Sequence, residues 1–273
     1  MAYPSPMTPG PPPAISRLVD TLAAGGLNVV GTVDVAQWDT IAPASRQSVA
    51  LLPGARCILV FGSGGPDLWS AFLADLRRDP RGLTEEVHPL DAFVARQVAA
   101  ADPLLGTITR RWFHAAATEA TPIDFRLLAH LGGLGTRSRP GILLHPRFGL
   151  WMGLRAACFV DVALPADAPL TVSPCDTCPS PCMAACPGGA FVDGALAIAR
   201  CAHHNRTTTD CATACHARAA CPEGAAFRYT PEEQAYHTNP NQGRRWLRTY
   251  LGIPPGRDHH EGDAPPWGAW TAE

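Results

Sequence analysis

The chain has 273 residues, of which 46% are hydrophobic and 17% are charged, and its formal net charge is −2. This composition supports a packed core and excludes a wholly disordered chain, and the length corresponds to one large domain or two small ones. No uncharged apolar run approaches about 18 residues, so we expect no membrane span. The weak negative charge argues against a nucleic-acid partner, because such proteins usually present a strong positive field.

The N-terminal residues 1–13 contain no basic residue and no apolar run of the kind that a signal peptide needs. We therefore expect a cytoplasmic protein, in a reducing compartment where clustered cysteines serve as metal ligands rather than as disulfides. All 22 basic residues are Arg. Chemistry that needs a lysine, such as Schiff-base formation, is therefore excluded.

Changes in composition divide the chain into five parts. Pro-rich and Gly-rich stretches predict a flexible arm at 1–14 and a flexible tail at 253–273. Between them we expect a core at 15–170, a cysteine-rich segment at 171–227 and helices that return to the core at 228–252.

Hydrophobic periodicity predicts the elements of the core. Apolar residues at helical spacing predict a helix at 15–24, which ends at the C-cap pair Gly25-Gly26. The other expected elements, in chain order, are strands at 27–35 and 57–61, helices at 66–77, 90–101 and 123–131, strands at 141–144 and 156–164, and helices at 231–236 and 244–251. Helices that alternate with strands predict a layered fold of the α/β or α+β class.

Eight of the ten cysteines fall in two runs between Cys175 and Cys221, and each run ends in Cys-Pro. In two-cluster ferredoxins, three close cysteines bind one [4Fe–4S] cluster and the cysteine before proline binds the other. The spacing therefore predicts two clusters whose ligands cross between the runs. The predicted sets are Cys175, Cys178, Cys182 and Cys221 for the first cluster, and Cys186, Cys201, Cys211 and Cys215 for the second.

The spacings depart from the usual C-x2-C-x2-C-x3-C-P run, since one extra residue precedes Cys182 and the second run is longer still. A structural zinc site is the alternative, because four thiolates also suit Zn²⁺. Three nearby histidines are either surface residues or substitute ligands: His203, His204 and His216. Cys57 and Cys158 lie in apolar runs and are expected to be buried, inert thiols.

The segment LLPGARCILVF at 51–61 is followed along the chain by a distinctive order of motifs. Those motifs are Pro122, a helix, Gly133-Leu134-Gly135, a strand, His145-Pro146 and the cysteine runs. In these features the chain resembles epoxyqueuosine reductase, a cobalamin-dependent iron–sulfur enzyme that acts on a tRNA base. The resemblance implies a role for Glu119, because that family has an acidic proton donor above the cobalt three residues before the matching proline. A carboxyl group in an apolar pocket can have a raised pKa and act as a general acid.

Two distant segments, HPRFGLWMGLR at 145–155 and RYTPEEQAYHTNPNQGR at 228–244, carry a second resemblance. They resemble the cobalamin-processing chaperone family, which removes the upper ligand of cyanocobalamin and alkylcobalamins. Together the two resemblances imply an α+β, flavin-reductase or nitroreductase-like core that binds cobalamin and carries a ferredoxin-like segment.

The chaperone family places arginines at the thiol cosubstrate and corrin site, and Arg155 and Arg244 match them. Arginine forks bind carboxylates in a bidentate manner, which is consistent with that role. His145, Phe148 and Trp151 pack either against the corrin ring or in the core.

The leading hypothesis is an iron–sulfur, cobalamin-binding oxidoreductase that reduces corrinoids or removes their upper ligand with electrons from two [4Fe–4S] clusters. Its partners would be a corrinoid and an external low-potential electron donor. One alternative is a reductase of a tRNA base or of a small substrate. The net charge of −2 argues against tRNA as its substrate. The other is a simple electron-transfer, ferredoxin-like protein, which leaves the N-terminal half of the chain without a role.

Overall fold

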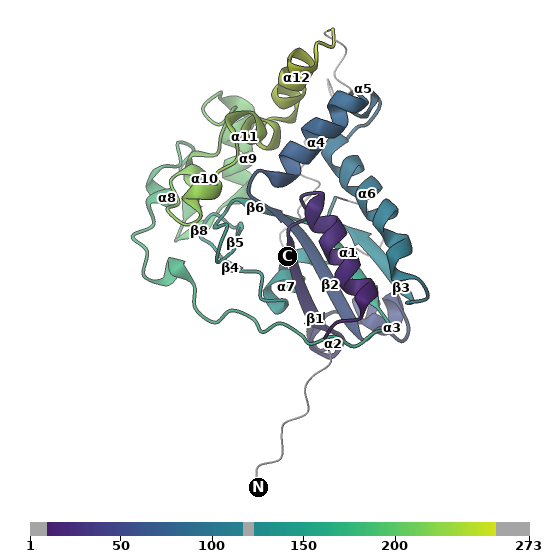
Figure 1. Cartoon of the computed structure of the whole chain (residues 1–273). Coiled ribbons are helices and arrows are strands. Elements are labelled where there is room, and N and C mark those ends of the chain that lie inside the picture. The colour runs from purple at the N-terminus through teal and green to yellow at the C-terminus, as the bar shows by residue number, and fades with distance from the viewer. Residues whose placement is uncertain (1–9, 117–122, 255–273) are drawn as a thin grey trace.

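The computed structural model describes residues 10–116 and 123–254, and the side chains of 240–242 are not described. A four-stranded antiparallel sheet forms its centre, with strand order β1-β2-β6-β3 (Figure 1). The strands are β1 (Val29–Asp34), β2 (Cys57–Gly64), β3 (Arg110–His114) and β6 (Met152–Val160). The mixed class predicted from the sequence is confirmed, and the antiparallel pairing makes it α+β.

β2 is a central strand that is buried along its whole length. Its continuous apolar run, CILVF, suits a strand that is covered on both faces. The register with β6 shifts between Phe61 and Gly62. Such a bulge bends a strand locally and redirects the side chains that follow it.

Three helices cover one face of the sheet (Figure 1). They are α1 (Pro13–Ala24), α4 (Asp67–Arg78) and α6 (Pro89–Ala101), with the short helix α5 (Arg81–Thr84) between the last two. Leu18 of α1 and Phe72 of α4 are fully buried against the sheet residues Leu59 and Phe61. Burial of a side chain of this size stabilises the fold by about 1.5–3 kcal/mol.

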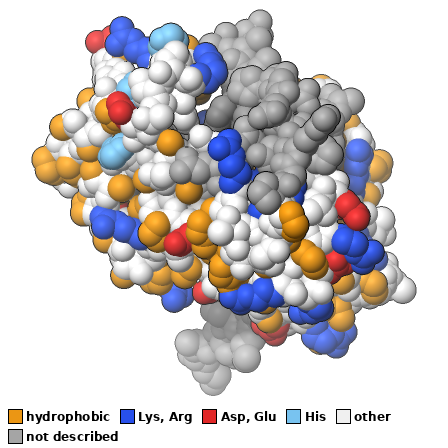
Figure 2. Space-filling view, turned by 90° about the horizontal axis from the view of Figure 1, so that it is seen from above, with side chains coloured by type: hydrophobic (Ala, Val, Ile, Leu, Met, Phe, Trp, Pro, Cys, Tyr) orange, Lys and Arg blue, Asp and Glu red, His pale blue; other side chains and the backbone are white. Residues whose placement is uncertain are grey.

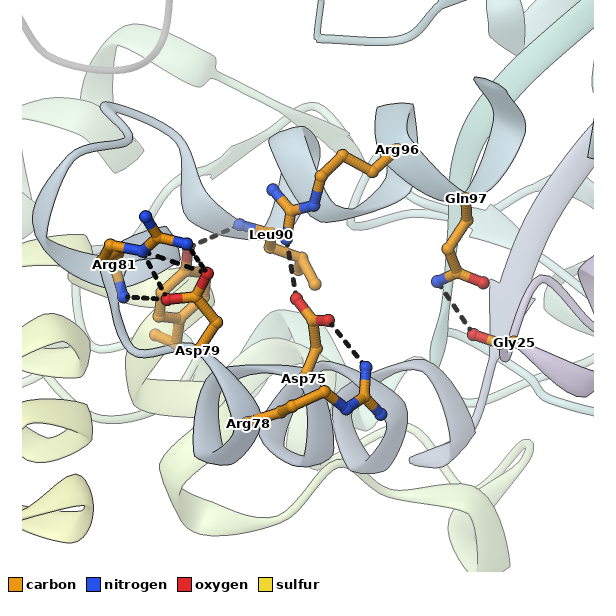
Figure 3. Close-up of polar contacts among 9 residues, drawn as sticks. Gly25, Asp75, Arg78, Asp79, Arg81, Leu90, Arg96 and Gln97 are labelled. Atoms are coloured by element: carbon orange, nitrogen blue, oxygen red, sulfur yellow. Dashed lines mark hydrogen bonds and ion pairs between the residues drawn. The ribbon is translucent and has the colours of Figure 1, made fainter. Parts of the chain in front are cut away.

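Polar contacts hold these helices to their neighbours (Figure 3). Arg96 of α6 donates to Asp75 of α4 at 2.7 Å, and Gln97 donates to the carbonyl of Gly25 at 3.1 Å. The amide of Leu90 donates to the hydroxyl of Tyr236, far along the chain, at 3.4 Å. The returning C-terminal helices are therefore tied to the start of α6.

The opposite face of the sheet is covered by shorter helices. They are α2 (Val35–Ile41), α3 (Ser48–Leu51) and α7 (Phe125–Leu131), with the 3-10 turn η1 (Ala44–Arg46) next to α3. A second 3-10 turn, η2 (Asp102–Leu105), follows α6 and contacts α1. Trp38 packs edge-on against Phe159, with ring centroids 6.4 Å apart. Leu128 of α7 is fully buried in the same cluster.

A two-stranded hairpin and the cysteine-rich segment lie beside one end of the sheet (Figure 1). The hairpin pairs β4 (Thr136–Arg137) with β5 (Leu143–Leu144). The segment consists of η3 (Pro174–Asp176), α8 (Pro181–Ala184), β7 (Phe191–Val192), β8 (Ala195–Leu196), α9 (Ile198–Thr207) and α10 (His216–Ala219). After η4 (Ala225–Phe227), the helices α11 (Pro231–Thr238) and α12 (Pro240–Leu251) return to the core.

The predicted elements differ from the observed ones mainly at their ends. α1 begins two residues before the expected start at Ile15. The strand expected at 156–164 begins at Met152 and ends at Val160. Most of the predicted arm and tail lies outside the described residues. No helix in the described part of the chain is both long and apolar enough to cross a membrane.

Candidate functional site

The first group of cysteines lies where α8 and α10 pack together. Burial raises the pKa of Cys182, and the nearby thiols of Cys175 and Cys178 raise it further. Burial likewise raises the pKa of Cys221, and Cys175 and Cys182 are among the charges that add to the rise. Cys221 therefore lies near the first run, although 38 residues separate it from Cys182 in the sequence.

The second group forms around α9. The pKa of Cys211 is raised to about 11, first by burial and then by Cys215, Cys186 and Cys201. The pKa of Cys201 is also raised, by desolvation first and then by Cys215 and Cys186. These shifts indicate that Cys221 lies near Cys175 and Cys182, and that Cys211 lies near Cys186, Cys201 and Cys215. Their role as ligands stays a prediction.

The donor set of each group is four thiols. Within residues 10–116 and 123–254, no three His, Cys, Asp or Glu side chains converge closely enough to hold a single metal ion. Tetrahedral Zn²⁺ with bonds of about 2.3 Å holds its sulfurs only about 3.8 Å apart. A [4Fe–4S] cube binds one thiolate at each of four iron corners, so its ligands stand farther apart. By ligand type alone, four thiols suit either centre.

A cavity of about 820 Å³ opens between α7, the β4–β5 hairpin and the cysteine-rich segment. Cys175 lines it together with Asp176, so the first group of thiols borders this space. Asp124, at the start of α7, also lines the cavity. Glu119, the predicted proton donor, lies outside the described residues.

Cationic side chains outnumber anionic ones in this cavity. Its charged or titratable lining residues are Arg126, His130, Arg137, Arg139, Asp124 and Asp176. The Nε atom of Arg139 is buried and has no hydrogen-bond partner among the described residues. The guanidinium of Arg139 lies against Gly194, in the turn between β7 and β8. An unpartnered buried donor is costly, by about 1–3 kcal/mol, which favours a ligand or water that accepts from it.

His145 organises the turn that follows β5. Its Nδ1 accepts from the amides of Arg147 and Phe148 at 3.0 and 3.2 Å. Burial lowers the pKa of His145, and the charge of Arg147 lowers it further. The imidazole is therefore neutral at pH 7, as an acceptor from two amides must be.

Phe148 fills the space beside Gly64 at the end of β2. A Cβ added at Gly64 would lie 2.3 Å from the Phe148 ring, so glycine is required there. Phe148 also packs edge-on against Phe227, with centroids 4.8 Å apart, and the Arg147 guanidinium covers both rings. This placement is core packing between the sheet and the cysteine-rich segment.

Trp151 is fully buried and its Nε1 has no hydrogen-bond partner in the described part of the chain. The Arg218 guanidinium lies over the rings of Trp151 and Tyr229, at 4.7 and 4.5 Å from their centroids. Arg218 also donates to the carbonyl of Leu150 at 3.0 and 2.6 Å. Cation–π contacts of this kind contribute most where the cation is desolvated.

Arg155 belongs to a buried polar cluster that includes two residues of α11. Its Nε donates to Ser63 at 3.2 Å, and its Nη1 lies 3.8 Å from a carboxylate oxygen of Asp91. Burial raises the pKa of Glu233 to about 8, an effect that the charges of Arg155 and Arg218 oppose. Burial lowers the pKa of His237 well below its ordinary value.

Glu233 and His237 form an acid–base pair that was not predicted from the sequence. Oε1 of Glu233 lies 3.9 Å from Nε2 of His237, and neither Oε2 of Glu233 nor that Nε2 has a hydrogen-bond partner within the described residues. Both residues stand in the chaperone-like segment 228–244, from which only Arg244 was singled out. Their i, i+4 spacing was the available indication that they share a helix face.

Arg244 is buried and ties α12 to the loop between α5 and α6. Its terminal nitrogens donate to the backbone carbonyls of Leu83, Glu86 and Val87 at 2.8, 3.0 and 3.1 Å. Arg155 and Arg244 therefore lie in different surroundings. Their assignment to a cosubstrate or corrin site stays a prediction.

No family model and no curated protein matches this sequence. Solved structures do share its fold. The C. elegans B12-trafficking protein CblC, a human MMACHC homologue, is 12% identical with a TM-score of 0.60 over 87% of this chain and 96% of that chain. A structure of selenomethionine-labelled epoxyqueuosine reductase is 15% identical with a TM-score of 0.55, over 81% of this chain and 68% of that one.

A further epoxyqueuosine reductase structure, with an epoxyqueuosine-modified tRNA stem loop, is 14% identical with a TM-score of 0.53 over 80% of this chain and 67% of that one. At these identities the likeness establishes the fold alone. Both families that the sequence motifs resemble are confirmed as structural neighbours of this chain.

Proposed function

We propose that the protein is a cobalamin-binding oxidoreductase that carries two [4Fe–4S] clusters and reduces or processes corrinoids. Its core would be nitroreductase-like and its cysteine-rich segment ferredoxin-like. The observation that carries the proposal is the place of Cys175, a member of the first thiol group, in the wall of the 820 Å³ cavity. A cluster held there would border the space that takes the corrinoid.

When bound, the clusters supply single electrons and the corrinoid supplies a cobalt centre that accepts them. The chain's own residues hold these groups in place. Leu143 is buried and Ile142 and Leu196 are partly buried, and these three give the cavity an apolar wall. Beside this wall stand the charged and titratable residues named above, so the cavity offers both apolar packing and polar contacts to a large ligand.

Arg137 and Arg139 are suited to the negatively charged part of the ligand. Cobalamin carries a phosphodiester in its nucleotide tail, and guanidinium groups bind phosphate oxygens in a bidentate manner. The buried, unpartnered Nε of Arg139 supports this assignment. Glu119 is proposed as a proton donor, because the sequence places it five residues before Asp124 in the cavity wall.

Anaerobic purification followed by cobalamin titration tests the proposal. We expect about eight irons per chain, cluster absorption near about 400 nm, and altered absorption and EPR spectra of cob(II)alamin on binding. Stoichiometric zinc in place of iron would overturn the cluster assignment. An unchanged cob(II)alamin EPR spectrum at saturating protein would overturn the corrinoid assignment.

A further inference from the structure

α9 is an exposed helix that carries one member of the second thiol group. None of its residues is buried, and Cys201 itself is exposed. The first group, by contrast, includes Cys175 in the cavity wall and the buried Cys182. The two groups therefore face different surroundings: one borders the proposed corrinoid cavity and the other borders solvent.

The surface of α9 is cationic. Its sequence, IARCAHHNRT, contains two arginines and two histidines and no acidic residue. Arg200 and Arg206 are exposed and have no ion pair or hydrogen bond within the described residues. A carboxylate oxygen of Asp210 lies 3.4 Å from Nε2 of His204, and neither arginine forms an ion pair within the described residues. Figure 2 shows histidine and arginine side chains gathered near one another at one end of the molecule.

A shallow hollow of about 440 Å³ lies at this surface. It is lined by Gly188, Ala199, Arg200, His203 and His204. Gly188 stands two residues after Cys186, which is also in the second thiol group, and a Cβ at Gly188 would lie 2.8 Å from the His204 side chain. The hollow therefore lies beside the backbone that carries Cys186 and Cys201, two members of the second thiol group.

We propose that the surface of α9 around Arg200 and Arg206 is the docking face for an acidic protein that carries single electrons. The inference rests on the proposed function, and it names the partner that supplies the electrons. A cluster held by Cys201 and the rest of the second thiol group would accept one electron from the reduced carrier, which is oxidised by one electron, and no atom is transferred. The cluster of the first thiol group, beside the cavity, would then supply electrons to the corrinoid.

Charge complementarity favours this partner. Complementary charge accelerates protein association and fixes orientation, and electron-transfer encounters use small interfaces, commonly below about 1,200 Å². A single exposed helix and a shallow hollow match such an encounter. They are too small for a permanent subunit interface, which buries about 2,000 Å² or more.

The test uses the cluster-loaded protein and a reduced, acidic plant-type ferredoxin as the probe. The double variant Arg200→Glu/Arg206→Glu is compared with wild type and with the control Arg17→Glu/Arg56→Glu, which makes the same charge change at exposed residues of the core. Stopped-flow absorbance at low ionic strength gives the rate of cluster reduction by the ferredoxin. Dithionite reduction and iron content are measured in parallel.

We expect the α9 variant to be reduced by ferredoxin at least tenfold more slowly than wild type, with a weaker dependence of the rate on salt. Iron content and the dithionite rate should be unchanged. Equal ferredoxin rates in both double variants would overturn the docking face while leaving the proposed function intact. Binding of a labelled oligonucleotide that only the α9 variant loses, with normal ferredoxin rates, would also overturn it. Iron-free wild-type protein would overturn the proposed function and this inference together.

Discussion

Glu233 and His237 face each other across one turn of α11, with 3.9 Å between Oε1 and Nε2, in an interior that also holds Arg155 and Arg218. Burial raises the pKa of Glu233 to about 8 and lowers that of His237. At pH 7 the pair is therefore a neutral carboxylic acid beside a neutral imidazole. A charged Glu233 would need a hydrogen-bond partner that the surrounding described residues do not supply to its Oε2.

The pair predicts an unusual dependence of stability on pH. The pKa of Glu233 is higher in the folded than in the unfolded chain, so its contribution is complete below about pH 4.5 and is lost as the pH rises through about 8. His237 acts in the opposite sense, because its pKa is lower in the folded chain, so stability falls as the pH drops below about 6.5. The free energy of unfolding of the wild type should therefore decrease between pH 6.5 and about 8, by up to about 1.4 kcal/mol per pH unit.

Glu233→Gln should flatten this dependence between pH 6.5 and about 8, because an amide has the shape of the neutral acid and does not ionise. The matched control is Glu232→Gln, which lies beside it on α11 and is less buried. The measurement is the free energy of unfolding from urea titrations at several pH values. Identical pH profiles for the wild type and Glu233→Gln would contradict the assignment of the titrating group.

Arg244→Met should destabilise the fold by about 2–4 kcal/mol, because three backbone carbonyls lose their buried donor. Arg245→Met, on an exposed side chain of the same helix, should change stability by less than about 0.5 kcal/mol. Urea unfolding measures both. A stable Arg244→Met protein that has lost corrinoid affinity would show that Arg244 contacts the ligand directly, as the chaperone resemblance implies.

The sequence predicted what is encoded locally. The CILVF run was enough to predict the central strand. The crossed grouping of the cysteines stays a prediction, although Cys175 is among the charges that raise the pKa of Cys221. β3 was missed because its sequence, RRWFH, looks polar. Arg110 and Trp112 both donate to the carboxylate of Asp102, which compensates their polarity at the edge of the sheet.

The buried acid–base pair could not be found in this way. Glu233 and His237 look like solvated residues of an ordinary helix until the fold places Tyr229 and Arg155 against them. Their burial is a tertiary property, created by residues that the sequence separates by up to about 80 positions. Helical spacing shows which residues share one side of a helix, but only tertiary packing decides whether that side is exposed to solvent.

Arg139→Gln should weaken the binding of cobalamin by about tenfold and leave the binding of cobinamide unchanged. Cobinamide lacks the nucleotide tail and its phosphodiester, and a charge-assisted hydrogen bond contributes about 1.5–3 kcal/mol. Corrinoid absorption spectra during titration give both dissociation constants, with Arg56→Gln as the control. Equal losses for the two corrinoids would remove Arg139 from the tail-binding role without removing the corrinoid from the cavity.

The protein should bind tRNA weakly and with a steep dependence on salt, because its net charge is −2. One structural neighbour is described with a tRNA stem loop, so the expectation needs a direct measurement. Fluorescence anisotropy with a labelled stem loop at about 50 and 200 mM salt provides it. A complex that survives the higher salt would favour the tRNA-base reductase over the corrinoid-processing function.

The crossed grouping of the cysteines makes a prediction about non-additivity. Cys178→Ser and Cys221→Ser alter the same group, so each should reduce the iron content from about eight to about four per chain, and the double variant should lose no more. Combining Cys178→Ser with Cys186→Ser alters both groups and should remove nearly all of the iron.

Cys158→Ser is the control, since this thiol is fully buried in β6, away from both groups, and should leave the iron content unchanged. Iron analysis and EPR of the reduced proteins measure the outcome. Loss of all iron in the Cys178/Cys221 double variant would mean that Cys221 belongs to the second group. That result would contradict the arrangement in which Cys175 and Cys182 raise the pKa of Cys221.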